Sequence, residues 1–245
     1  MKFYYKRAMW LWILATLVAF FIKGLCGFAN TLVFTSILAF GSNNINISPI
    51  ELLVGYPPNL ILTWKNRKSL KPAVFLPLAL LVLLGSIPGA FLLKTMDSRL
   101  IKIIFGIVVI VVALDMLLRE AHRGICKESK ILLASTGVLS GILCGMFGVG
   151  ALLAAYVGRV TGTSNEFKAN ISAAFIVENT FRFITYTMLD IITLPSLKTA
   201  AALMPFMLIG LFAGIKSSSV LPEKTVRHLV IALLIVSGIA LMWQS

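Results

Sequence analysis

Two apolar stretches of this chain are too long to cross a lipid bilayer once as a single upright helix. They cover about residues 8–40 and 131–160. At 1.5 Å per residue, about 30 residues form about 45 Å of helix, whereas the hydrocarbon core of a bilayer is about 30 Å thick. Glycines interrupt both stretches, at Gly24-Leu25-Cys26-Gly27 and between Gly145 and Gly150. Each stretch is therefore expected as one long tilted helix or as two half-helices that meet inside the membrane.

Six further apolar stretches are separated by short polar connectors. They lie at about 47–64, 72–93, 100–118, 169–189, 199–215 and 228–243. Hydrophobic residues make up 59% of the 245 residues and charged residues 13%, whereas soluble domains have about 45–50% and about 25%. This excludes a soluble globule, a disordered chain and a secreted disulfide scaffold. The sequence predicts an all-α membrane protein of about eight hydrophobic segments.

Short matches between the two parts of the chain indicate an internal duplication. Their offsets of 118, 120 and 125 residues keep the same order. The matched pairs are Leu25-Cys26-Gly27-Phe28 with Leu143-Cys144-Gly145-Met146, Asn59 with Asn179, and Gly85/Gly89 with Gly210/Gly214. We expect two homologous halves, residues 1–120 and 121–245, in one integral membrane domain.

The direction of the two halves depends on how the long stretches cross the membrane. If both re-enter as hairpins, each half crosses an odd number of times and the repeats are inverted. If all eight segments span, the repeats are parallel. The re-entrant arrangement gives the larger imbalance of loop Lys and Arg between the two sides, so the positive-inside rule favours it.

The net charge of +13 comes mainly from basic residues in connectors. Two clusters stand out: Lys65, Arg67, Lys68 and Lys71, and Arg119, Arg123, Lys127 and Lys130. Such clusters are typical of cytoplasmic loops beside anionic lipids, and we expect a multi-pass plasma-membrane protein that binds no nucleic acid. The three Cys and two His form no plausible metal set and no catalytic triad is evident, so neither a metal, a cofactor nor an enzyme is predicted.

Four polar residues lie inside apolar segments: Lys23, Glu178, Asn179 and Arg182. Charged groups at bilayer depth are costly, so by default they face the protein interior and mark a functional site. Glu178 and Arg182 are one helical turn apart and can pair. With Lys23 they leave one positive charge, which suits a monoanion. Glu178 would orient Arg182 or take part in proton coupling; alternatively, the pair only neutralises itself.

The glycine breaks predict backbone donors for the same anion. A half-helix that starts inside the membrane presents free N–H groups and the positive end of its dipole. This makes Gly27 and Asn30 substrate-binding candidates at the first break, and Gly145, Gly148 and Gly150 at the second. Alternatively, these glycines only allow close helix packing.

The two matched asparagines, Asn59 and Asn179, complete the candidate site as hydrogen-bonding groups. Pro57-Pro58 precede Asn59 and remove two backbone donors, so a kink or break is expected there. Glu51 is expected at the end of its segment, with a possible part in proton or coupling-ion transfer.

Taken in order, these motifs resemble the sulfite exporter TauE/SafE family of bacterial inner-membrane proteins. The resemblance rests on Lys23-Gly24-Leu25-Cys26-Gly27-Phe28-Ala29, on the run from Gly141 to Gly150 followed by Tyr156, and on the small-residue helix and charged turn between Gly85 and Gly106. The chain departs from the family pattern at Ala151-Leu152-Leu153, where Gly-Pro-Pro is frequent. It also departs at Phe28-Ala29-Asn30, where a triple glycine is frequent.

The resemblance implies secondary transport, usually export, of sulfite, an organosulfonate or a related small anion, driven by an ion gradient. The expected partners are this anion and the lipid bilayer. The short loops argue against a large partner interface outside the bilayer and leave a lateral homodimer open. A passive anion channel and a membrane assembly protein without transport are the alternatives.

Overall fold

The computed structural model describes residues 2–39, 44–121, 140–146 and 150–218, together with residues 138, 228, 231, 232, 235 and 239. Within these residues the secondary structure is helical, and no strand is found. The predicted all-α class is therefore confirmed for the described part of the chain. The connector at 122–137 and most of the predicted stretch at 228–243 lie outside it.

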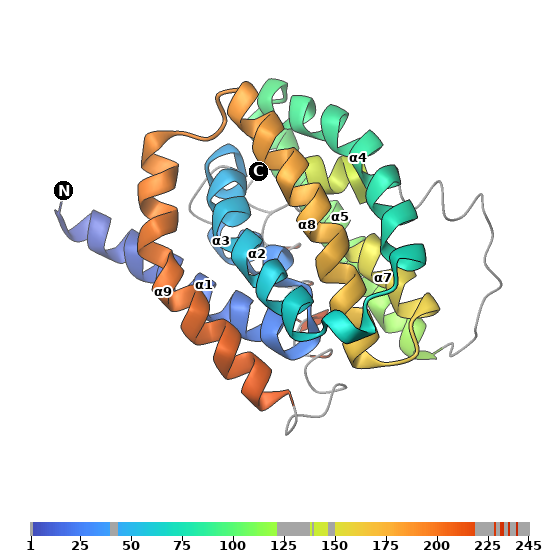
Figure 1. Cartoon of the computed structure of the whole chain (residues 1–245). Helices are drawn as coiled ribbons and strands as arrows, with labels where there is room; N and C mark the ends of the chain where they lie inside the picture. Colours follow the sequence, from blue (N-terminus) through green and yellow to red (C-terminus); the bar gives the residue numbers. More distant parts are fainter. Residues whose placement is uncertain are drawn as a thin grey trace.

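The first half contributes five α-helices and one short 3₁₀ turn. They are α1 (Lys2–Cys26), α2 (Asn30–Ala39), α3 (Asn44–Lys65), η1 (Arg67–Ser69), α4 (Pro72–Thr95) and α5 (Ser98–Ala121). In the second half, helical residues 140–146 are followed by α7 (Ala151–Val160), α8 (Ser164–Met188) and α9 (Leu194–Ser217). Helix α8 packs against both α3 and α4, and α1 lies along α9 (Figure 1).

Of the two arrangements expected for the first long apolar stretch, the structure has the broken one, and the break lies at the glycines. Helix α1 ends at Cys26 and α2 begins at Asn30. Between them, Gly27 has a φ of 87° and Ala29 a φ of 70°. A positive φ cannot continue a right-handed helix, so the chain must turn here. In the second stretch, helical residues reach Met146, and Gly150 is the N-cap of α7.

Close packing of α1 on α9 depends on glycine. A methyl group placed on Gly24 would overlap the carbonyl oxygen of Leu211, and one on Gly214 would overlap that of Phe21. On Gly210 it would lie 2.6 Å from Leu17 O. Backbone thus contacts backbone along this interface, as small-residue pairs allow in membrane helices.

The same arrangement recurs between α4 and the helical residues 138 and 140–146. Gly85 and Gly89 of α4 face the carbonyl oxygens of Val138 and Ile142, and Gly145 faces Ser86 O. The third apolar segment of each half, α4 or α9, therefore packs on the broken first segment of the other half. This packing confirms the structural interpretation of the Gly85/Gly89 and Gly210/Gly214 pairs.

Gly24→Ala is expected to destabilise the protein by about 1–3 kcal/mol, in the range for overpacking a close contact. The added methyl group would meet Leu211 O and lie 2.7 Å from Ile215 N. Both are backbone atoms, so the helices would have to separate. Thermal unfolding in detergent measures the effect. Gly162→Ala is the matched control because no atom lies within 4 Å of the added group; equal unfolding temperatures for the two variants would contradict the prediction.

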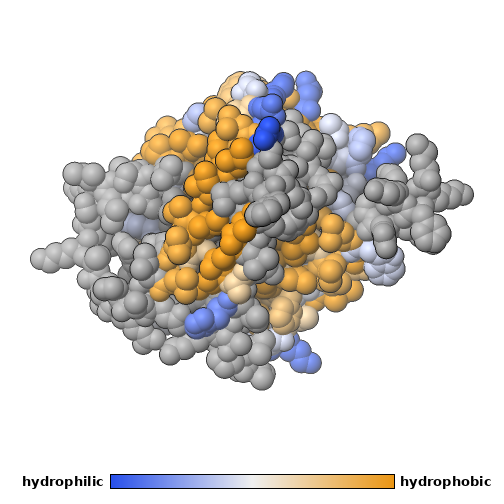
Figure 2. Space-filling view, turned by 180° about the vertical axis from the view of Figure 1, so that it is seen from behind, coloured by the Kyte–Doolittle hydropathy of each residue, from blue (hydrophilic) through white to orange (hydrophobic). Residues whose placement is uncertain are grey.

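Three helices of the described chain are long and apolar enough to cross a membrane: Met9–Cys26 of α1, α4 and α9. Large hydrophobic side chains are exposed on them, including Leu14, Leu84 and Phe212. On the face shown in Figure 2, hydrophobic residues form a broad central area with hydrophilic ones at its upper and lower edges. This distribution is what a lipid-embedded protein requires.

A kink or a break was expected at Pro57-Pro58, and the break is wrong. Helix α3 continues from Asn44 to Lys65 with Pro49, Pro57 and Pro58 inside it. A proline removes one N–H and crowds one carbonyl, yet α3 packs along α2, α8 and α9. In membrane helices, neighbouring elements can hold such a segment helical.

Candidate functional site

Five charged side chains are buried in the part of the chain that the structure describes. They are Lys23, Glu51, Lys168, Glu178 and Arg182, each at most 9% exposed. Lys23 is near the end of α1, Glu51 is on α3, and the other three are on α8. Buried charges are expensive unless they are paired, so their contacts define the candidate site.

Glu51 lies between the two halves and receives hydrogen bonds from both. Thr31 Oγ1 and Asn30 Nδ2, at the start of α2, donate to Glu51 Oε1 at 2.6 and 2.9 Å. Arg182 Nη2 on α8 donates to Glu51 Oε2 at 3.3 Å. Gly55, one turn along α3, leaves space for the carboxylate, since a methyl group there would lie 2.9 Å from Oε1.

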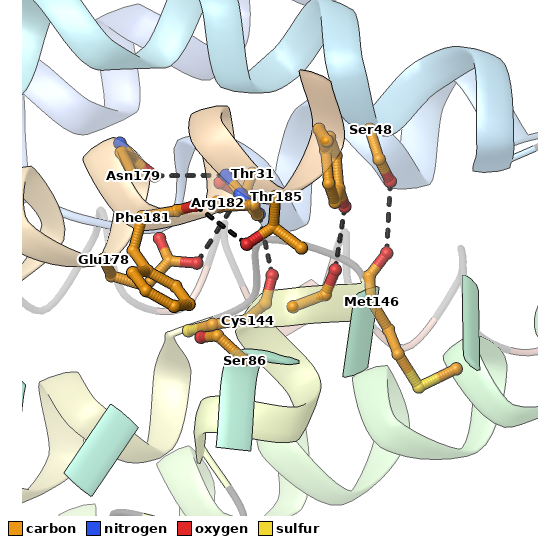
Figure 3. A network of polar contacts seen from close by, with 12 residues as sticks. Thr31, Ser48, Ser86, Cys144, Met146, Glu178, Asn179, Phe181, Arg182 and Thr185 are labelled. Atoms are coloured by element: carbon orange, nitrogen blue, oxygen red, sulfur yellow. Dashed lines mark hydrogen bonds and ion pairs between the residues drawn. The ribbon is translucent and has the colours of Figure 1, made fainter. Parts of the chain in front are cut away.

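Each of the three guanidinium nitrogens of Arg182 contacts a polar group of another residue. Figure 3 shows the contacts with Cys144, Glu178 and Asn179. Besides Glu51, it donates from Nη1 to the carbonyl of Cys144 at 2.8 Å and from Nη2 to Asn179 Oδ1 at 3.1 Å. Its Nε forms an ion pair with Glu178 Oε1 at 3.5 Å. Arg182 therefore ties α8 to α3 and to the end of the helical residues 140–146.

Lys23 joins the same network from the first break. Its Nζ donates to Asn30 Oδ1 at 2.9 Å and lies 5.7 Å from the centre of the Phe175 ring. Phe175 also reaches the second break, because a methyl group on Gly150 would overlap its ring. Lys23, Asn30, Glu51 and Arg182 thus form a continuous polar chain from one half to the other.

Each break is contacted by the second helix after the other half's break, α8 in one case and α3 in the other. At the first, a methyl group on Gly27 would lie 2.7 Å from Cγ of Lys168, near the start of α8. At the second, Ser48 of α3 donates to the carbonyl of Met146 at 3.2 Å. Residues 48 and 168 are 120 positions apart, which is the offset of the asparagine pair.

The structure brings together most of the residues that the sequence proposed. Lys23, Asn30, Asn179, Arg182 and Glu178 belong to the polar network. Gly145 joins through its carbonyl, which accepts from Tyr186 Oη at 2.8 Å. The other proposed glycines, Gly27 and Gly150, flank it, whereas Gly148 lies outside the described residues.

Asn59 is buried on α3, but it does not join the network through its oxygen. Its side chain is 1% exposed, and its Oδ1 has no hydrogen-bond partner in the described part of the chain. The matched Asn179 accepts from Arg182. The two asparagines therefore have different surroundings. Their neighbours in the sequence also differ, since Pro58 precedes Asn59 and Glu178 precedes Asn179.

The expected position of Glu51 at the end of its apolar segment is wrong. Helix α3 begins at Asn44, so Glu51 is two turns inside it and 2% exposed. Its carboxylate cancels the single positive charge expected from Lys23, Arg182 and Glu178. Lys168, which directly precedes the apolar stretch at about 169–189, is also buried and restores an excess of one cation among the five buried charges.

A second polar cluster holds the start of α8 near the connector before α4. Buried Asn170 accepts from the backbone N–H of Lys71 at 2.9 Å and donates to Ser69 O at 3.3 Å. Lys71 Nζ forms an ion pair with Glu166 at 2.9 Å. The Lys71 hydrogen bond and that from the Gly162 N–H lower the pKa of Glu166, which precedes the apolar stretch of α8.

Because the pKa of Glu166 is lowered by folding, its contribution to stability is complete above about pH 5 and is lost as the pH falls through the lowered value. Glu166→Gln is therefore expected to reduce stability at neutral pH and to flatten this part of the acid dependence. Thermal unfolding between pH 7 and pH 3 in detergent measures it. Parallel curves for the variant and the wild type would contradict the assignment.

The described residues contain no group of three or more His, Cys, Asp or Glu side chains that could hold a metal ion. The site instead offers nitrogen donors: one ammonium, one guanidinium and one amide close together. Such donors bind carboxylate, sulfonate and similar oxyanions.

Apolar exposed helices, a helix break and a buried charged network define a polytopic membrane protein with an intramembrane polar site. The profile of the sulfite exporter TauE/SafE family matches residues 12–241, and the chain belongs to this family. It is therefore a multi-pass membrane protein of a transporter family, which confirms the resemblance seen in the sequence. Neither a curated protein nor a solved structure matches the chain.

Proposed function

We propose that this protein is a secondary transporter that exports a small anion, sulfite or an organosulfonate, under an ion gradient. The observation that carries the proposal is the buried chain of contacts from Lys23 through Asn30 and Glu51 to Arg182. Intramembrane charges mark transport pathways because a fold keeps them only where they serve a function.

The donors of this chain fit an oxyanion. Arg182 presents a planar guanidinium, and Asn30 and Thr31 present side-chain donors at the first turn of α2, where the helix dipole favours negative charge. Lys23 and Lys168 add positive charge beside the first break. A sulfonate or sulfite, with several equivalent oxygens, can accept from several of these groups together.

We infer that the two halves are inverted repeats and that this site lies at their interface. Support comes from the reciprocal packing of α1 with α9 and of α4 with residues 138 and 140–146. It also comes from the equal lengths of α2 and α7, ten residues each. Alternating access would then move one half against the other around the polar network.

Uptake into proteoliposomes tests the function. Labelled sulfite and labelled methanesulfonate would be offered to vesicles with and without an inward proton gradient. Gradient-dependent accumulation above protein-free vesicles is expected. Uptake that only follows the anion's own gradient would identify a channel, and absence of uptake in sealed vesicles with inserted protein would reject anion transport.

A further inference from the structure

The donors expected to bind the anion already hold a carboxylate of the protein itself. Glu51 accepts from Thr31, Asn30 and Arg182. Its two oxygens thus engage the start of α2 on one side and the guanidinium of α8 on the other. A substrate oxyanion would need these same hydrogen atoms.

We propose that Glu51 holds the anion position in the substrate-free protein, and that substrate replaces it as Glu51 takes up one proton. This rests on the proposed function and names its coupling ion. The step is balanced: the carboxylate becomes a carboxylic acid, and the monoanion accepts the hydrogen bonds from Thr31, Asn30 and Arg182. No covalent bond to the substrate forms.

The charge balance around Glu51 favours entry of a proton together with the anion. Among the residues joined by hydrogen bonds and ion pairs, Lys23 and Arg182 are balanced by Glu51 and Glu178. The excess positive charge among the five buried groups comes from Lys168, which lies beside Gly27 at the first break. An anion that took the place of Glu51 at Arg182 would lie next to an ionised carboxylate, and two like charges repel strongly in a buried site. An anion that enters with one proton leaves the total charge unchanged and removes this repulsion.

Glu51 fits this role better than Glu178. Glu178 lies on the same helix as Arg182, one turn away, and its pairing with Nε is local to α8. Glu51 comes from α3 and connects two helices that belong to different halves. Its release from Arg182 would therefore loosen the contact between the halves, which a step of alternating access needs.

Several titratable and charged groups surround Glu51 and take part in its electrostatic environment. They are Lys23 on α1, Cys144 in the helical residues 140–146, and Glu178, Arg182 and Tyr186 on α8. The experiment must therefore separate Glu51 from the other carboxylate, Glu178, and from the general effect of pH on the protein.

Isothermal titration calorimetry distinguishes these contributions. It measures the binding of methanesulfonate to the detergent-solubilised full chain. This anion remains ionised throughout the pH range, so any proton that is bound enters the protein. Measurement in Tris and in bis-tris, whose ionisation enthalpies differ, gives the number of protons taken up. We expect about one per anion for the wild type, with affinity that strengthens up to tenfold for each pH unit lowered.

Glu51→Gln is expected to bind the anion with no proton uptake and with an affinity independent of pH. Glu166→Gln is the matched control, because this carboxylate lies on the exposed start of α8, and it should retain the proton uptake of the wild type. If Glu51→Gln does not fold, wild-type binding without proton uptake still overturns the inference, and loss of proton uptake in Glu178→Gln assigns the proton to Glu178 instead.

Three results would overturn the inference: wild-type binding without proton uptake, unchanged uptake in Glu51→Gln, or loss of uptake in Glu178→Gln while Glu51→Gln retains it. In each of these cases the protein still binds the anion, so the proposed function stands. If the wild type neither binds methanesulfonate nor transports sulfite or methanesulfonate, the proposed function fails and the inference fails with it.

Discussion

Arg182→Gln is expected to reduce anion uptake into proteoliposomes by about 100-fold or more. Arg182 is 2% exposed and donates to Glu51, Asn179 and the carbonyl of Cys144. The neutral amide would leave Glu51 and Glu178 as two buried carboxylates without their common cation. Removing one member of a buried ion pair costs about 3–5 kcal/mol, and the substrate anion would meet the same uncompensated charge.

Arg182→Lys separates the loss of charge from the loss of geometry. Lysine keeps one positive charge, but its ammonium cannot form the planar arrangement that reaches Glu51, Asn179 and Cys144 together. We expect this variant to fold and to retain at most about a tenth of the uptake. Thermal unfolding and gel filtration in detergent check that each variant is folded. Uptake within twofold of the wild type in both folded variants would remove Arg182 from the binding site.

Lys23→Gln tests the other end of the polar chain. Lys23 contacts Asn30 rather than Glu51 directly, so its loss should weaken uptake less than the loss of Arg182. We expect about a tenfold reduction in the same assay. If this variant and Arg182→Gln both transported as the wild type does, the buried cations would have no part in anion recognition.

The sequence allowed the helix break to be expected as one of two alternatives, and several residues of the candidate site to be proposed, because both depend on local rules. A stretch longer than the bilayer must tilt or break, and Gly27 marks where it breaks. Charged residues inside apolar stretches must face the interior, which identified Lys23, Glu178 and Arg182. Arg182 and Glu178 were even expected to pair, since one helical turn separates them.

The position of Glu51 could not be predicted by these rules. It stands four residues after the start of its apolar stretch at about residue 47, and a carboxylate at a segment end is commonly solvated. Only the tertiary structure reveals that α3 begins three residues earlier, at Asn44, and that Arg182, 131 residues away in sequence, faces Glu51. Lys168 was missed for the same reason, because its burial against Gly27 depends on how α8 packs on the first break.

The polar network depends in turn on the backbone of the first break. Asn30 and Thr31 reach Glu51 because the chain turns between Cys26 and Asn30, and two residues there have positive φ. Gly27, at 87°, adopts this conformation without strain, whereas Ala29, at 70°, does so at a cost of about 1–2 kcal/mol. Within the same turn, the residue at position 27 therefore suits its backbone conformation, whereas the residue at position 29 is strained.

Opposite effects on stability are therefore expected from Gly27→Ala and Ala29→Gly. The first should destabilise by about 1–3 kcal/mol, because it adds strain and brings a methyl group to 2.7 Å from Cγ of Lys168. The second should stabilise by up to about 1 kcal/mol, since relief of strain exceeds the entropy that glycine loses on folding. Thermal unfolding in detergent measures whether each substitution lowers or raises the stability of the protein. Gly27→Ala should also lower anion uptake about tenfold, because the donors of Asn30 and Thr31 would shift away from Glu51. If both substitutions destabilised equally, packing rather than backbone conformation would determine the turn.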